Sequence, residues 1–179
     1  TGKQGLRDTE TMARQTGSLL GTEDESVLIC STGVIGVPMP MERVSEGISA
    51  AAAELGRGKG KDDDAAQAIL TTDTFTKQEC VELDIAGTPV RIAGIAKGSG
   101  MIHPNMATML SFIVTDATLE EGLLQKLLGD SVVDSYNMIS VDGDTSTNDT
   151  VLALANGAAS NPVITEGSSS YEKFKEAFD

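Results

Sequence analysis

Residues 81–100 of the chain, VELDIAGTPVRIAGIAKGSG, decide the class of fold that the sequence encodes. Apolar residues alternate with polar ones on both sides of a turn at residues 86–89; they are Val81, Leu83, Ile85, Val90 and Ile92. Because successive side chains of a strand point to opposite faces of its sheet, this alternation predicts a β-hairpin with one buried face. The second strand of the hairpin leads directly into the glycine-rich residues 97–100.

Helices and further strands are predicted on both sides of this hairpin. Apolar residues at helical spacing predict helices within residues 5–20, 40–55, 123–132 and 171–178. Thr118, with Glu121 three residues later, has the spacing of a capping box before the third of these helices. Short apolar runs predict strands at residues 27–30, 107–114 and 151–154. In a chain of 179 residues, these elements indicate one domain, or a piece of a larger one, of the α+β class.

The composition excludes several classes of function. A formal net charge of −14 would repel the phosphate backbone of a nucleic acid. No apolar run approaches the roughly 20 residues of a membrane-spanning helix, so no membrane partner is expected. Two cysteines are too few for a disulfide scaffold, and the N-terminus lacks the apolar core of a secretory signal, so we expect a cytoplasmic protein. Since Thr1 is not an initiator methionine and the last helix lacks a capping glycine, we also expect a piece of a longer protein.

The residues that most often carry catalysis are scarce. His103 is the only histidine, and the chain has no Gly-x-Ser-x-Gly motif in which a serine nucleophile could pair with it. Residues 142–149 begin like a calcium-binding loop, but Thr147 stands where that loop needs glycine and Ala153 where it needs glutamate. No metal site is therefore predicted.

Residues 97–110, KGSGMIHPNMATML, have a structural and a functional interpretation. As structure, they form a Gly-Pro loop that enters a strand, and spacing alone favours this interpretation. As chemistry, they contain the junction between Ala107 and Thr108. A threonine with a free α-amine carries its own base, with a pKa of about 7.7–8.0, whereas an internal threonine is a weak nucleophile. Such an amine arises inside a chain only when the preceding peptide bond is cut.

Four motifs follow one another at compatible separations: STGVIG at 31–36, TTDT at 71–74, KGSGMIHPNMATML at 97–110 and GDTSTNDT at 143–150. With these motifs the sequence resembles the ArgJ-type ornithine acetyltransferases over essentially its whole length. The resemblance implies the layered α/β/β/α architecture of the DmpA/ArgJ-like fold. It also implies that residues 1–107 are the C-terminal part of an α chain and residues 108–179 the N-terminal part of a β chain.

The resemblance assigns the central chemical roles to four residues. The bond between Ala107 and Thr108 corresponds to the bond that the family cleaves in itself, and Thr108 to the nucleophile, which also contacts substrate. Thr32 and Gly33 correspond to the hydroxyl and the backbone N–H that stabilise the oxyanion, where losing one donor costs on the order of 3 kcal/mol. From the residues alone, the two glycines of STGVIG predict a tight, exposed turn.

Two further positions correspond to substrate-binding residues of the family. Lys97 corresponds to a lysine that could hold a substrate carboxylate and lower the pKa of the nearby threonine amine. The structural alternative, a surface lysine, is disfavoured by the glycines around Lys97. Thr71 corresponds to a substrate-binding threonine, and the adjacent Thr72 remains an alternative for that role.

The activity implied by the resemblance is that of a glutamate N-acetyltransferase. An acetyl-enzyme on Thr108 would carry acetyl from N2-acetylornithine to glutamate in arginine biosynthesis, without a cofactor. Acetyl-CoA is a second donor for some members, which would add amino-acid N-acetyltransferase activity. The family assembles its α and β chains as a heterotetramer. Two alternatives remain: a related self-processing amidase or aminopeptidase, with water as the acceptor, and a non-catalytic acidic interaction module.

Overall fold

The computed structural model describes residues 2–102 and 109–179, and the chain folds into two compact units. The first unit is Thr1–Asp62 and the second is Asp63–Asp179. The predicted boundary between α and β chains at residues 107 and 108 lies outside the described residues and stays a prediction. Among the described residues, no helix combines the length and the apolar character needed to cross a bilayer.

The first unit is built from two helices that pack on each other. Helix α1 is Gly2–Leu20 and helix α2 is Met41–Ala53, with Pro40 at its N-cap, so both predicted helices are confirmed. The Gln15 side chain of α1 donates to the Ser45 carbonyl of α2 at 2.8 Å and accepts from the Ser45 hydroxyl at 2.8 Å. A short 3₁₀ helix, η1, spans Asp24–Ser26.

One sequence-based expectation about the first unit is corrected. Residues 27–30 do not form a strand, because a short apolar run becomes a strand only where a neighbouring chain completes its ladder, and they are not part of the four-stranded sheet. The polar run at residues 56–64 contains the start of a further helix. Helix α3, Lys59–Ala68, begins within it and continues into the second unit, with Asp62 in its first turn.

The predicted hairpin organises the second unit. Strand β1, Lys77–Ile85, pairs antiparallel with strand β2, Thr88–Lys97, and Ile85 lies opposite Thr88. Only Ala86 and Gly87 connect the strands, with φ of 53° and 87°, as a two-residue hairpin turn requires. The Gly87 N–H donates to the Asp84 carboxylate at 3.0 Å, which closes the turn.

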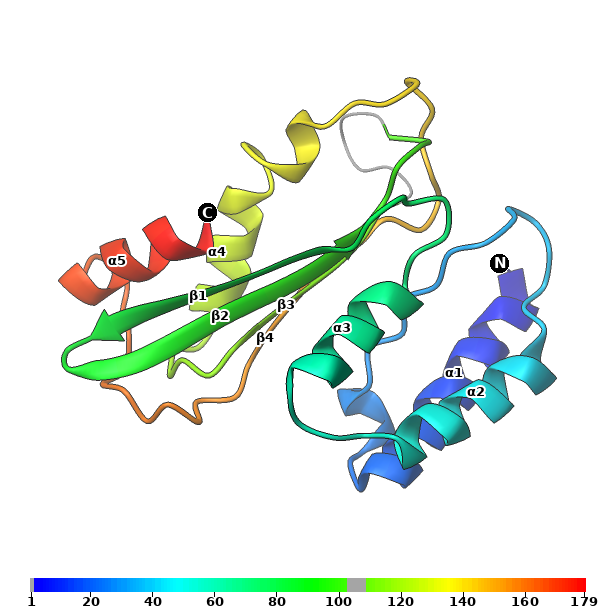
Figure 1. Cartoon of the computed structure of the whole chain (residues 1–179), viewed down its shortest axis with the longest axis horizontal. Coiled ribbons are helices and arrows are strands. Elements are labelled where there is room, and N and C mark those ends of the chain that lie inside the picture. Colours follow the sequence, from blue (N-terminus) through cyan, green and yellow to red (C-terminus); the bar gives the residue numbers. More distant parts are fainter. Residues whose placement is uncertain (1, 103–108) are drawn as a thin grey trace. The chain divides into compact units, whose positions relative to one another are not determined.

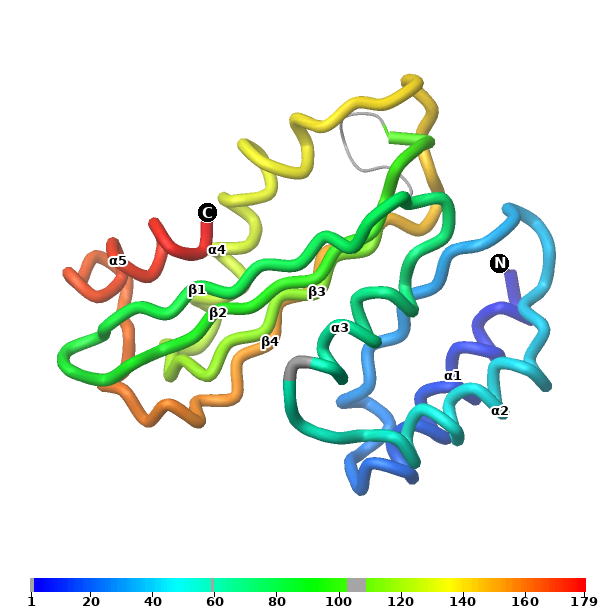
Figure 2. Tube along the Cα trace, viewed as in Figure 1, coloured from blue at the N-terminus to red at the C-terminus, as the bar shows by residue number. Residues whose placement is uncertain are grey.

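The hairpin extends into a four-stranded sheet with the strand order β1-β2-β3-β4. Strand β3, Leu110–Thr115, is antiparallel to β2, and strand β4, Thr150–Ala155, is parallel to β3. Figure 2 shows the four strands side by side in this order. The described part of the predicted strand at 107–114 and the predicted strand at 151–154 are therefore confirmed.

Helices α4, Leu123–Ser131, and α5, Ser169–Phe178, cover one face of the sheet (Figure 1). They contribute Leu123, Leu127, Tyr171, Phe174 and Phe178 to a core shared with Ile85, Val90 and Ile92 of the hairpin. The predicted buried face of the hairpin is therefore confirmed, apart from Val81, which is exposed. The predicted α+β class is confirmed. The described residues form one sheet of the layered architecture that the resemblance implies.

The predicted capping box before α4 is wrong. The helix begins at Leu123 after Gly122, whose φ is 79°, and no side chain caps it. Thr118 instead belongs to the connection that follows β3, where its N–H donates to the Asn161 side chain at 2.8 Å. Helix α5 has the side-chain cap that α4 lacks, since the Ser168 hydroxyl accepts from the Tyr171 N–H at 3.1 Å.

We expect Phe174→Ala to destabilise the second unit by about 3–5 kcal/mol. The Phe174 side chain is fully buried between α5 and the sheet, so its removal leaves a cavity as well as losing apolar burial. Urea unfolding followed by circular dichroism measures the change. Glu172→Ala, at an exposed position of the same helix, is the matched control and should change the free energy of unfolding by less than about 0.5 kcal/mol.

Candidate active site

Lys97 is the last residue of β2 and is almost completely buried, with 2% of its surface exposed. Its interpretation as a surface lysine is therefore wrong. No hydrogen bond or ion pair links its ammonium group to another described residue. Burying the charge of a lysine is costly unless that charge is compensated, so this position requires neighbouring negative charge or a ligand.

The TTDT motif at residues 71–74 lies against residues 97–99. The Gly98 N–H donates to the Asp73 carboxylate at 2.8 Å, and Lys77 Nζ donates to the same oxygen, Oδ1, at 2.5 Å. The hydroxyls of Thr72 and Ser99 are 2.7 Å apart and share a hydrogen bond. The fold thus brings the segments of two predicted substrate-binding residues, Thr71 and Lys97, together within the second unit.

Burial and charge act in opposite directions on the titrating groups of this cluster. Burial lowers the pKa of Lys97, and the nearby carboxylates of Asp73 and Asp149 partly oppose that change. Burial also raises the pKa of Asp73, but the hydrogen bonds from Lys77 and Gly98 outweigh it, so the net pKa lies below the usual value. Burial raises the pKa of Asp149, against the hydrogen bonds that it accepts and the charge of Lys97.

The GDTSTNDT motif and the residues before it hold both flanks of residues 103–108. On one side, the Ile102 N–H donates to the Val141 carbonyl at 2.9 Å, and the Met101 N–H donates to the Asp142 carboxylate at 2.7 Å. On the other side, the Met109 N–H donates to the Asp149 carboxylate at 2.7 Å. The Thr150 N–H then donates to the Met109 carbonyl at 3.0 Å.

The predicted nucleophile Thr108, the predicted cleavage partner Ala107 and the only histidine, His103, lie outside the described residues. Their assignments stay predictions. The described neighbours Ile102 and Met109 are both buried. The chain on either side of the predicted cleavage site is therefore held in place by the loop that precedes β4.

Thr32 and Gly33, the predicted oxyanion residues, belong to the first unit, whereas Lys97 and Thr71 belong to the second. Thr32 is half-buried and Gly33 is exposed. The tight, exposed turn predicted at residues 31–36 is confirmed, with its hydrogen bond from the Val37 N–H to the Val34 carbonyl at 3.2 Å. Only Gly36, at φ 85°, needs the conformational freedom of glycine, so turn geometry does not explain Gly33.

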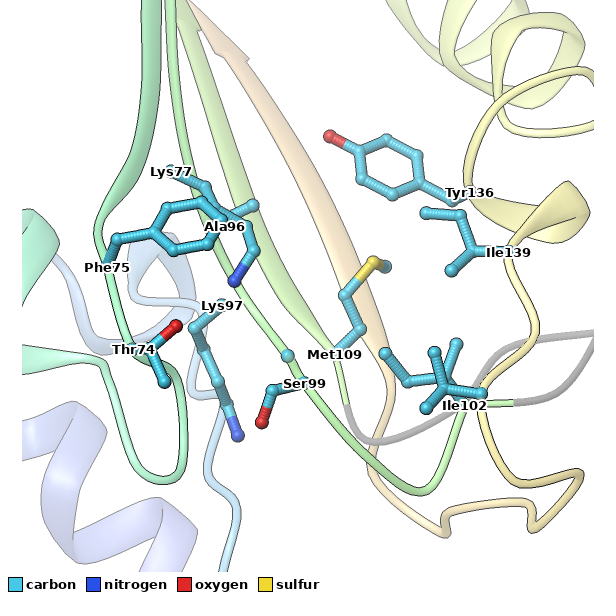
Figure 3. A pocket seen from close by; sticks show the side chains of 12 residues that line it. Thr74, Phe75, Lys77, Ala96, Lys97, Ser99, Ile102, Met109, Tyr136 and Ile139 are labelled. Carbon is cyan, nitrogen blue, oxygen red and sulfur yellow. The ribbon is translucent and has the colours of Figure 1, made fainter.

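A cavity of about 390 Å³ opens at the end of the sheet where β2 finishes. Figure 3 shows Phe75 and Lys77 on one side of it and Met109, Tyr136 and Ile139 on the other. Ala96 and Lys97 are successive strand residues, so their side chains point to opposite faces of the sheet. Figure 3 shows Lys97 among the residues that line the cavity, with its ammonium group extending away from Tyr136 in this view.

Tyr136 connects this cavity to the sheet. Its hydroxyl lies 2.7 Å from the hydroxyl of Ser111, which is buried in β3. The cation of Lys77 lies over the Phe75 ring, 4.9 Å from its centroid, at the opposite wall.

Within residues 2–102 and 109–179, no group of three or more His, Cys, Asp or Glu side chains is arranged to hold a metal ion. Asp142, the first residue of the calcium-like pattern, instead accepts N–H groups of Met101 and Asp144.

A model of the ArgJ family matches residues 1–179, which is the whole chain. The chain belongs to the ArgJ family. It is 56% identical over 177 residues to the arginine biosynthesis bifunctional protein ArgJ of Symbiobacterium thermophilum. It is 51% identical over 179 residues to the protein of the same name from Caldanaerobacter subterraneus. These two matches include 99% and 100% of this chain, respectively. The chain spans 44% of the length of each relative.

A solved ArgJ structure supports the fold. The crystal structure of the arginine biosynthesis bifunctional protein ArgJ from Bacillus halodurans is similar with a TM-score of 0.53 at 40% sequence identity. The similarity covers 60% of this chain and 55% of that chain. The expected DmpA/ArgJ-like class of fold is consistent with this neighbour.

Two carboxylates of the ArgJ motifs were missed as site residues when the sequence was considered alone. Asp73 lies within TTDT and Asp149 within GDTSTNDT, and both influence the pKa of Lys97. The only signal for them was their place inside two of the four motifs of the family. Nothing in the spacing indicated that residues 52 positions apart at 97 and 149 would meet, since that pairing depends on the parallel register of β3 and β4.

We expect Asp73→Asn to weaken the dependence of stability on pH in acid. The carboxyl of Asp73 has a pKa below its ordinary 3.8 in the folded chain, so its stabilising contribution is complete above the unfolded value. That contribution is lost as the pH falls through the lower, folded value. The free energy of unfolding, measured by urea titration between about pH 5 and pH 2, should therefore fall less steeply in the variant than in the wild type. Identical slopes would contradict this assignment.

Proposed function

We propose that the full-length protein containing this chain is a self-cleaving acetyltransferase of arginine biosynthesis, which moves acetyl from N2-acetylornithine to glutamate. Membership of the ArgJ family over the whole chain supports this proposal, as do relatives named arginine biosynthesis bifunctional protein. The observation that carries it is Lys97. This lysine is almost completely buried and makes no hydrogen bond to another described residue, so its cation is suited to bind a substrate carboxylate.

Thr71 is proposed as the second substrate-binding residue of this cluster. The hydroxyl of the neighbouring Thr72 is hydrogen-bonded to the hydroxyl of Ser99, with 2.7 Å between the oxygens. The Thr71 side chain makes no hydrogen bond to another described residue. Thr71 is also exposed, so its hydroxyl is accessible from solvent. These two observations favour Thr71 over Thr72 for contact with a polar group of the substrate.

The proposed reaction is a two-step acyl exchange on Thr108. The α-amine of Thr108 takes the hydroxyl proton while the oxygen attacks the acetamide carbon of N2-acetylornithine. Negative charge then develops on the carbonyl oxygen, where the Thr32 hydroxyl and the Gly33 N–H are proposed to donate to it. Ornithine leaves with the proton, and the amine of glutamate attacks the threonine ester to release N-acetylglutamate.

The proposed maturation uses the same hydroxyl. Thr108 attacks the carbonyl carbon of Ala107, the acyl group moves from nitrogen to oxygen, and water hydrolyses the ester to leave a free threonine amine. The resulting α and β chains are proposed to assemble as a heterotetramer. Acetyl-CoA is proposed as a second acetyl donor, and the exchange itself needs no bound cofactor.

Thr108→Ala should yield an uncut protein without transferase activity. Alanine lacks the hydroxyl that both maturation and acetyl transfer require. Intact-mass spectrometry of the full-length protein gives the result directly, because cleavage produces two chains. Thr108→Ser, which retains a hydroxyl, is the matched control and should still cleave. Normal cleavage of Thr108→Ala would refute the role of Thr108, and an uncut wild type would favour the non-catalytic acidic module.

Glutamate should increase the rate at which acetyl leaves N2-acetylornithine. The proposed acceptor is an amine that attacks the acetyl-enzyme, so ornithine release should rise with glutamate concentration and match N-acetylglutamate formation. Mass spectrometry of the products measures both. Release of acetate at a rate independent of glutamate would instead identify the amidase or aminopeptidase alternative, with water as the acceptor.

A further inference from the structure

We propose that Asp73 is a positioning residue for substrate binding, which holds the Gly98 backbone and keeps Lys97 available as a free cation. This inference rests on the proposed function, because Lys97 is the residue through which Asp73 would act. Asp73 comes from the segment between α3 and β1, and Lys97 from the end of β2. The two residues are therefore joined by tertiary structure.

The contacts of Asp73 support a role that is separate from direct pairing with Lys97. Its side chain has no exposed surface, and its Oδ1 accepts from both Lys77 Nζ and the Gly98 N–H. The other oxygen, Oδ2, is buried without a hydrogen-bond partner among the described residues. A buried oxygen in this state lowers stability, so the arrangement is not the one that stability alone would favour.

The electrostatic consequence of this arrangement lies at Lys97. Burial disfavours the charged form of Lys97, while the Asp73 carboxylate favours it without forming an ion pair with it. Asp73 thus favours the protonated form of Lys97 and leaves the hydrogen-bond donors of its ammonium group for a substrate carboxylate. A direct ion pair would preserve the charge too, but it would occupy those donors.

Among the residues that the structure describes, three charged groups affect the charge of Lys97, directly or through Asp73. Asp73 faces it from the 71–74 segment, and Asp149 faces it from the loop before β4. Lys77, from the start of β1, pairs with Asp73 and partly cancels its field. Changing Asp73 and changing Lys77 should therefore alter the pKa of Lys97 in opposite directions, while Asp149 is the same in both variants.

The test is a pH profile of kcat/KM for N2-acetylornithine with the full-length, matured enzyme. Asp73→Asn keeps an acceptor for Gly98 but removes the charge, so the alkaline limb should move to lower pH. At neutral pH its KM should rise by roughly tenfold, with a smaller change in kcat. Lys77→Gln removes the partner of Asp73, so the alkaline limb should move to higher pH.

The control is Asp84→Asn. Asp84 also accepts a backbone N–H, that of Gly87, but it lies in the hairpin turn at the other end of β1. The alkaline limb of the kcat/KM profile of Asp84→Asn should match that of the wild type. Lys77 is partly exposed, so the Lys77→Gln arm decides the question even where Asp73→Asn fails to fold.

Limbs displaced in opposite directions would support the positioning role of Asp73. Coincident limbs, or loss of kcat without displacement of either limb, would overturn it in favour of a purely structural role. Failure of the proposed function gives a different result, because the wild-type enzyme would then transfer no acetyl group to glutamate. The substrates are the same for every variant, so their own titration cancels in the comparison.

Discussion

The burial of one ammonium group, that of Lys97, is the constraint on which the candidate site depends. An ammonium group removed from water needs compensation, and the chain supplies it with carboxylates from two separate segments. Asp73 arrives with the TTDT motif and Asp149 with the start of β4, so both motifs must be in place around the end of β2. The hairpin places Lys97 at the end of β2, and the parallel pairing of β3 with β4 places Asp149 near it.

The fold was predictable where local geometry determines it. The alternation at residues 81–92 predicted the hairpin, and its two-residue turn follows from residues that accept positive φ. Helical spacing predicted α1, α2, α4 and α5 for the same reason. Predictions failed where a partner element decides the outcome. Residues 27–30 are apolar but do not join the sheet, and Thr118 bonds to Asn161 instead of capping α4. Neither partner is visible in local sequence.

The site was predictable to a smaller extent. Resemblance to a family directed attention to Thr71 and Lys97, and the structure brings their segments together. The structure also shows that Lys97 is buried, whereas the only local signal against a surface lysine was the glycines around it. Asp73 and Asp149 went unassigned because a carboxylate acquires its role from what it meets in space. Thr32 and Gly33 lie in the other unit, and Thr108 lies outside the described residues, so their roles depend on the proposed experiments.

The two outer strands of the sheet differ in a way that matters for handling the protein. Strand β1 carries Lys77, Glu79, Glu82 and Asp84, charges that discourage another strand from adding to its edge. Strand β4, TVLALA, has no charge, and among the described strands only β3 pairs with it. Its outer edge is a template for intermolecular β-sheet growth. We therefore expect preparations of this chain alone to aggregate through β4, and a lysine introduced at exposed Leu154 to improve their yield.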